Sequence, residues 1–126
     1  MTLKSRPSLR SRYSKVSAYV TKDGSLVREL MHPAVQGNRL QSLAEAQIQP
    51  GLSTRLHRHR RSEELYHITA GVGLMTVGTR TFRVHAGDTL CIAPGTPHRI
   101  RNTGNRPLVI LCCCAPAYSH QDTELL

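Results

Sequence analysis

Residues of the types that bind transition metals lie close together in two segments of this sequence. His57 and His59 stand two positions apart, and Glu64 follows them. His98 comes directly after a Pro-Gly-Thr-Pro turn in the second segment. Alternate residues of a β-strand point to the same face, so the imidazoles of His57 and His59 would share one face. Three imidazoles and a carboxylate suit a borderline divalent ion such as Fe, Mn, Co, Ni, Cu or Zn, and they leave coordination positions for substrate, water or dioxygen.

The surrounding sequence predicts that short β-strands position these side chains. Asp23-Gly24 is a hairpin-like turn signal between two alternating segments. Residues 39–49 alternate polar with small or apolar side chains, which favours a strand over a short helix ended by Pro50-Gly51. Further strand-forming runs, separated by turn residues, occupy residues 54–60, 64–70, 73–77, 80–84, 88–93, 98–102 and 107–114. This regular spacing predicts an all-β sandwich or barrel.

Two spaced patterns in the sequence resemble the motifs of the cupin superfamily. The first pattern consists of Gly51, His57, His59, Glu64 and Gly71. The second consists of Gly87, Gly95, His98 and Asn102, and it has Ala93 beside Pro94 where the family pattern has its first proline. The resemblance implies a single-domain cupin jelly-roll barrel, which is also called a double-stranded β-helix.

The resemblance also implies roles for individual residues. As metal ligands of one divalent transition ion per chain it implies His57, His59, Glu64 and His98. The motif glycines would be structural, with Gly71 and Gly95 at turns, and Asn102 would brace a loop. Strand alternation predicts that Glu63, the neighbour of Glu64, faces outward. The alternative is a barrel that keeps these polar residues but has lost its metal.

Strand alternation further predicts which residues line a substrate pocket beside the metal. Tyr66 and Ile68 share the parity of Glu64 and are expected to point into the barrel, together with Met75. Arg55 shares the parity of His57 and could anchor a substrate carboxylate. An outward, solvated Arg55 at the mouth of the barrel is an equal alternative.

The charge of the chain is concentrated near its N-terminus. The 126 residues carry a formal net charge of +9, and residues 1–22 contain six lysines and arginines and no acidic residue. We expect residues 1–15 to form a basic, flexible arm, although a transit peptide is conceivable, and residues 16–126 to form the barrel, with a tail from about residue 115 that folds back. No recognition motif accompanies the charge and no long apolar run occurs, so neither a nucleic-acid partner nor a membrane partner is expected.

The cysteines indicate a reducing environment. Cys112, Cys113 and Cys114 are adjacent, and neighbouring residues on a strand point to opposite faces, so they cannot form ordinary disulfides with one another. Reduced thiols and a cytoplasmic location are therefore expected. Either Cys112 and Cys114 or Cys113 alone must face the barrel interior.

These observations predict a metal-dependent enzyme that acts on a small chelating organic substrate. Beyond the ligands, Tyr66 and the unplaced histidines are the only candidates for a general base, which favours dioxygenase-type chemistry over proton transfer. The alternatives are an isomerase or lyase and a non-catalytic module that binds a small carboxylate or sugar. A homodimer that pairs through the strand near residues 16–20 is expected, because pairing would protect an exposed sheet edge.

Overall fold

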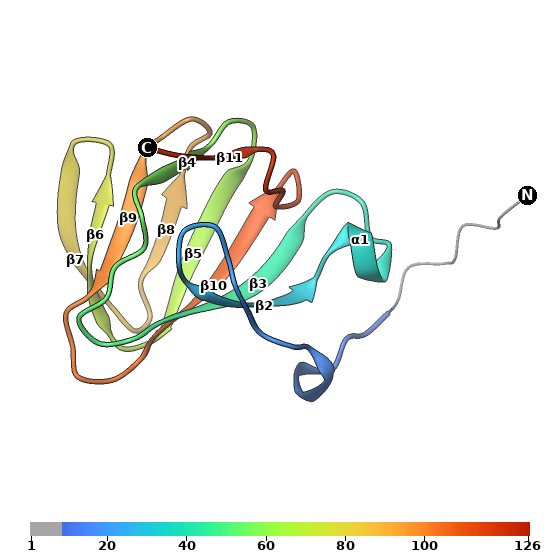
Figure 1. Cartoon of the computed structure of the whole chain (residues 1–126), viewed down its shortest axis with the longest axis horizontal. Coiled ribbons are helices and arrows are strands. Elements are labelled where there is room, and N and C mark those ends of the chain that lie inside the picture. The colour runs from blue at the N-terminus through green and yellow to red at the C-terminus, as the bar shows by residue number, and fades with distance from the viewer. Residues whose placement is uncertain (1–8) are drawn as a thin grey trace, which may run out of the picture.

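Two antiparallel sheets pack face to face in the computed structural model, which describes residues 9–126 (Figure 1). In order across the first sheet, the strands are β1 (Tyr19–Val20), β2 (Leu26–Met31), β3 (Ser42–Ile48), β10 (Leu108–Ala115), β5 (Glu63–Ala70) and β8 (Thr89–Ile92). In order across the second, they are β11 (Thr123–Leu125), β4 (His57–His59), β9 (His98–Asn102), β6 (Val72–Val77) and β7 (Arg80–His85). This arrangement confirms the predicted all-β jelly-roll barrel in a single domain.

Alternating side chains of the strands fill the space between the two sheets. On β5, Glu64, Tyr66 and Ile68 are buried, whereas Glu63 and His67 on the opposite face are exposed. The apolar core consists of Ile48, Tyr66, Ile68, Met75, Val84, Ile92, Ile100, Leu108 and Ile110. Burying aliphatic side chains of this size contributes roughly 1.5–3 kcal/mol each, so this core holds the sheets together.

Glycine is required at the turn between β5 and β6. Gly71 has a φ of 89°, which L-residues with a side chain rarely adopt. A Cβ atom at Gly71 would lie 2.8 Å from the carbonyl oxygen of Pro107 and 2.9 Å from Cα of Leu108. The neighbouring chain therefore approaches so closely that only glycine fits.

The two histidine-bearing segments are joined by hydrogen bonds near the motif turns. The amide of Gly95 donates to the carbonyl oxygen of His59 at 2.6 Å. At the opposite end of β9, the buried amide group of Asn102 donates to the carbonyl oxygens of Ile48 at 2.8 Å and Arg106 at 2.7 Å, and it accepts from the amide of Gly104. The side chain of Asn102 thus braces the loop that leads from β9 to β10.

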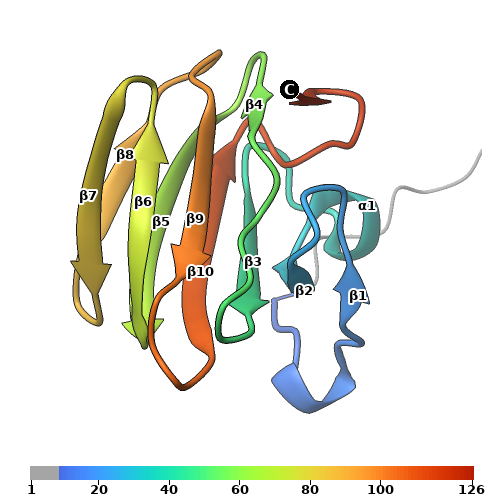
Figure 2. The same cartoon turned by 60° about the vertical axis from the view of Figure 1, so that its left-hand side comes forward.

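The last part of the chain returns to the barrel. Residues 116–122 lead to β11, which pairs antiparallel with β4 and places Thr123 opposite His59 and Leu125 opposite His57 (Figure 2). A helical turn, α1 (Pro33–Gln36), follows β2; the side chain of His32 caps its start and Gly37 ends it. None of the helices within residues 9–126 has the length and apolar character needed to cross a membrane.

Only part of the predicted N-terminal arm falls within the described residues. Residues 1–8 lie outside them. Tyr13–Lys15 form a short 3-10 helix, and the phenol of Tyr13 donates to Glu45 on β3 at 2.6 Å. The end of the arm is therefore in contact with the first sheet.

Candidate metal centre

Three buried imidazoles meet at one end of the barrel. His57 and His59 come from β4, and His98 comes from β9, where it pairs directly with His57. One ring nitrogen from each histidine lies within 4.8 Å of the other two. The side chains are almost fully buried, with exposed fractions of 2%, 5% and 0%. The sequence-predicted histidines are thus brought together at one point.

Hydrogen bonds to backbone carbonyls fix the ring tautomers of two of these histidines. Nδ1 of His57 lies 2.6 Å from the carbonyl oxygen of Arg55, and Nδ1 of His98 lies 2.9 Å from that of Thr96. A carbonyl oxygen only accepts, so Nδ1 must carry a proton in both rings, and Nε2 is the nitrogen left to bind a metal ion. Within residues 9–126, Nε2 of His98 is buried without a hydrogen-bond partner.

A hydroxyl group from the last strand fixes the tautomer of the third histidine. Nδ1 of His59 lies 2.9 Å from the hydroxyl oxygen of Thr123 on β11. The same hydroxyl donates its proton to the carbonyl oxygen of Ser119, so it accepts from His59. In all three histidines Nδ1 is therefore held as a hydrogen-bond donor, which leaves Nε2 as the nitrogen that can bind a metal ion.

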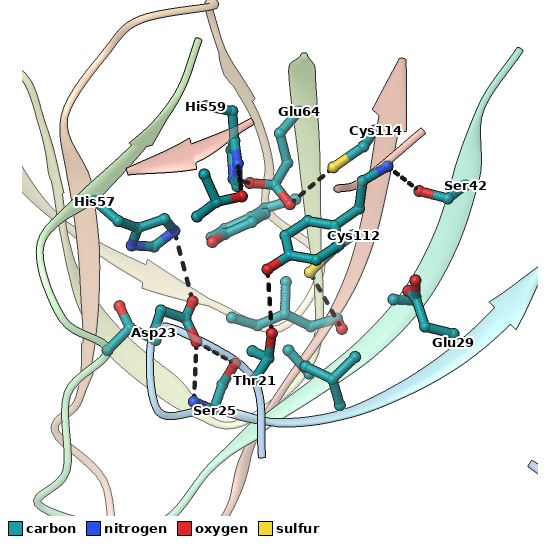
Figure 3. A pocket seen from close by; sticks show the side chains of 18 of the residues that line it. Thr21, Asp23, Ser25, Glu29, Ser42, His57, His59, Glu64, Cys112 and Cys114 are labelled. Atoms are coloured by element: carbon teal, nitrogen blue, oxygen red, sulfur yellow. Dashed lines mark hydrogen bonds and ion pairs between the residues drawn. The ribbon is translucent and has the colours of Figure 1, made fainter. Parts of the chain in front are cut away.

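Glu64 on β5 faces two of the three histidines. Its Oε1 lies 3.0 Å from Nε2 of His59 (Figure 3) and also 3.5 Å from Nε2 of His98. Burial by itself favours the neutral acid, but the contacts with His59 and His98 lower the pKa of Glu64 to about 2. A carboxylate oxygen and a nitrogen lone pair at this distance need a proton or a cation between them.

The arrangement fits a divalent transition ion. Imidazole nitrogens and a carboxylate are ligands that Fe, Mn, Co, Ni, Cu and Zn accept. Nε2 of His98, a buried lone pair without a partner in the described part of the chain, is the observation that a bound ion would explain. The hydrogen bonds at the three Nδ1 atoms are of the kind that orients metal-binding histidines.

A pocket lined by His57 and His59 adjoins the site; the empty space in it, open solvent included, is about 600 Å³. Tyr66, Ala44, Ala46 and Ile110 are among its apolar lining residues, so Tyr66 lies where the sequence analysis placed it. The β1–β2 hairpin borders the same pocket and contributes polar groups to it, including Thr21.

Asp23, in the turn of that hairpin, is a site residue that sequence reasoning missed. Its Oδ2 lies 3.5 Å from Nε2 of His57 (Figure 3). Its Oδ1 accepts hydrogen bonds from the amide of Ser25 at 2.9 Å and from the hydroxyl of Ser25 at 2.7 Å. Asp23-Gly24 was interpreted only as a turn signal, and nothing in the local sequence indicates that the turn folds over the histidines.

Two of the adjacent cysteines face the pocket. Cys112 and Cys114 line it, whereas Cys113 points the other way, with its thiol 3.7 Å from the side-chain oxygen of Gln41. Burial raises the pKa of the Cys112 and Cys114 thiols, so both stay protonated at neutral pH. The thiol of Cys114 donates to Oε2 of Glu64 at 3.3 Å and helps to hold that carboxylate.

Two predicted pocket residues lie elsewhere, and a third, Arg55, takes the outward position that was its equal alternative. Ile68 and Met75 are fully buried in the apolar core and do not line the pocket. Strand alternation correctly predicts that both side chains point inward. They lie further from the end of the barrel at which the histidines meet. Arg55 is exposed, because β4 begins only at His57 and its alternation does not extend back to residue 55. Arg55 contributes its backbone carbonyl, not its guanidinium, to the site.

Comparison with known proteins agrees with this architecture. The family model described as "Cupin domain" matches residues 44–114. An uncharacterized protein of Methanocaldococcus jannaschii is 52% identical over 118 residues, which are 94% of each chain. The tetracenomycin polyketide synthase protein TcmJ of Streptomyces glaucescens is 27% identical over 108 residues, covering 82% of this chain and 72% of that protein.

Among solved structures, a predicted oxalate decarboxylase from Thermotoga maritima superimposes with a TM-score of 0.73. It is 26% identical, and the match covers 83% of this chain and 96% of that one. The sequence motifs, the jelly-roll barrel and the match to the family model over more than half of the chain lead to one conclusion. This chain belongs to the cupin family.

Proposed function

We propose that this protein is a metal-dependent enzyme that acts on a small chelating organic substrate. The observation that carries the proposal is the convergence of three buried Nε2 atoms, of which that of His98 makes no hydrogen bond within the described residues, next to a pocket lined by His57 and His59. A barrel that had lost its metal would gain nothing from holding three buried imidazoles in this tautomer. The similarity to a predicted oxalate decarboxylase supports an enzymatic function.

In such a site, some residues of this chain would bind the metal ion and others would shape the pocket. His57, His59, His98 and Glu64 would hold one divalent ion. That ion would supply Lewis acidity toward a chelating substrate and, if redox-active, electron transfer to dioxygen. Tyr66 and the small apolar side chains of Ala44 and Ala46 would shape the pocket and exclude water.

We favour dioxygen as the co-substrate. The apolar side chains that line the pocket suit a small organic chelator such as an enol, diketone, hydroxy acid or catechol-like compound.

A second candidate reaction is favoured by Asp23. Its Oδ2 faces the site and supplies a carboxylate that can accept a proton from a bound substrate, which the sequence did not predict. Isomerase-type or lyase-type chemistry, which needs such a base, is therefore the alternative.

The test is oxygen uptake by protein reconstituted separately with Fe, Mn, Ni, Cu and Zn, against a panel of these chelators. We expect oxygen consumption that requires both metal and substrate. The variant His98→Ala should abolish it, whereas His67→Ala, on the exposed face of β5, should not. Conversion that proceeds without oxygen and is lost in Asp23→Asn would favour the proton-transfer candidate. Tight binding with no chemical change would contradict both and indicate a binding module.

A further inference from the structure

The pocket beside the histidines has a charge opposite to that of the chain. Lysines and arginines outnumber acidic residues 17 to 8 in the sequence. Nevertheless, three of the eight acidic residues, Asp23, Glu29 and Glu64, line the pocket, and no lysine or arginine of residues 9–126 does so. An acidic pocket in so basic a protein calls for a functional explanation.

Nearby cationic side chains are directed away from the pocket or used elsewhere. Arg28 alternates with Glu29 on β2 and lies against the ring of Tyr13 and near Glu45 on the outside of the sheet. The ammonium group of Lys22, in the shallower depression next to the pocket, donates to two backbone carbonyls of the C-terminal segment, at 3.1 Å and 2.6 Å. Neither cation is placed to meet a substrate carboxylate beside the histidines.

His32 does not supply the missing positive charge either. Its Nδ1 accepts a hydrogen bond from the amide of Ala34 at 3.0 Å, and its Nε2 lies 2.7 Å from the carbonyl oxygen of Tyr118. One nitrogen accepts and the other donates, so the ring is neutral. The ring lies near Glu29 without neutralising it.

Asp23 is the carboxylate on which the charge argument rests. Burial raises the pKa of Glu29, which favours the neutral acid over the negatively charged carboxylate. The carboxylate of Asp23 is fixed by Ser25, its backbone carbonyl accepts from the amide of Arg55 at 2.8 Å, and its free oxygen points toward the metal-binding nitrogen of His57. A divalent ion together with Glu64 and Asp23 has no net charge. A substrate anion would then meet repulsion from Asp23 without a surplus of positive charge to offset it.

We propose that the pocket selects organic chelators that are neutral or positively charged outside their chelating group, and that Asp23 determines this selectivity. The inference rests on the proposed metal-dependent function and names its substrate class. An amine-bearing substrate could place its ammonium group against Oδ2 of Asp23, with hydroxyl groups such as that of Thr21 nearby. Chelators that carry a further carboxylate outside the chelating group are disfavoured.

The experiment compares three ligands with the same chelating group and different tails. Dopamine, 4-methylcatechol and 3,4-dihydroxyphenylacetate carry a positive, a neutral and a negative tail: an ammonium group two methylene groups from the ring, a methyl group, and a carboxylate one methylene group from the ring. Binding to the zinc-loaded protein is measured by calorimetry, because zinc is redox-inert and leaves the catechols intact. We expect dopamine and 4-methylcatechol to bind at least about tenfold more tightly than the acid. The tail of the acid has the same charge as Asp23, and like charges at close range repel each other.

The variant Asp23→Asn should reduce this preference to less than about threefold, since it removes the charge but keeps an oxygen for Ser25. The matched control is Asp88→Asn, in the turn before β8 and outside the pocket, which should keep the wild-type ratio. Equal or tighter binding of the acid, or an unchanged ratio in Asp23→Asn, would overturn the inference while leaving the metal-dependent function standing. Failure of the protein to hold zinc, or of all three catechols to bind, would overturn the proposed function itself and the inference with it.

Discussion

Glu63 and Glu64 are adjacent acids with opposite surroundings. Glu64 is buried against His59 and His98, whereas Glu63 is exposed on the outer face of β5. A protein with all four predicted ligands should bind about one divalent transition ion per chain. We expect Glu64→Gln to weaken that binding at least about tenfold, because a neutral amide replaces an anionic ligand.

Glu63→Gln is the matched control and should bind the ion like the wild type. Metal content after dialysis against a graded series of chelator concentrations measures both variants. An empty site in Glu63→Gln together with a full site in Glu64→Gln would show that the ligand assignment is wrong.

At the residue scale, the sequence was sufficient for groups that follow a spacing rule. His57 and His59 share a parity on β4, so their common direction follows from the pattern, whereas the inclusion of Glu64 and His98 as ligands followed from the resemblance to the cupin motifs. Asp23 does not follow from it, because its approach to His57 depends on how a hairpin distant in sequence folds over the barrel. Tertiary placement of this kind leaves no periodic signal in the chain.

At the scale of elements, β11 is a three-residue strand that supports one of the three histidines. The hydroxyl of its Thr123 accepts a hydrogen bond from Nδ1 of His59 and donates one to the carbonyl oxygen of Ser119. We expect Thr123→Val, which keeps the shape but loses the hydroxyl, to lower metal affinity about tenfold to a hundredfold, as loss of such supporting hydrogen bonds does at other metal sites.

Serine at position 123 restores the hydroxyl and should recover most of the affinity. Thermal unfolding of the metal-free variants provides the control for a purely structural effect. If Thr123→Val destabilises the fold but binds metal like the wild type, β11 contributes only to the edge of the sheet.

Alternation predicts the face of a strand residue but not its depth in the barrel. Ile68 and Met75 were correctly expected to point inward, yet they belong to the core below the pocket. Arg55 shows the related problem at a strand end, since parity holds only while the backbone stays extended and paired. β11 itself gave no sequence signal, because three residues are too few to display a period.

At the scale of the whole molecule, β1 is the exposed edge of the six-stranded sheet. Tyr19 and Val20 are 36% and 70% exposed there. We propose that two copies pair through this strand, which would cover unpaired backbone groups. Sedimentation equilibrium of the wild type should give the mass of a dimer.

Val20→Lys should give a monomer, because a charge on the edge opposes pairing. Val35→Lys, at an equally exposed valine of α1, should remain a dimer. A monomeric wild type would contradict this assembly.

The order in which the site residues occur along the chain has a consequence for biosynthesis. His57, Glu64 and His98 are translated first, but the hydroxyl that sets the tautomer of His59 lies at position 123, and β11 must pair with β4 to deliver it. A nascent chain that has not yet released residues 119–125 from the ribosome holds an incomplete binding site. The ion would therefore be held at full affinity only after this segment emerges and β11 pairs with β4, so that tight metal binding would follow the folding of this strand.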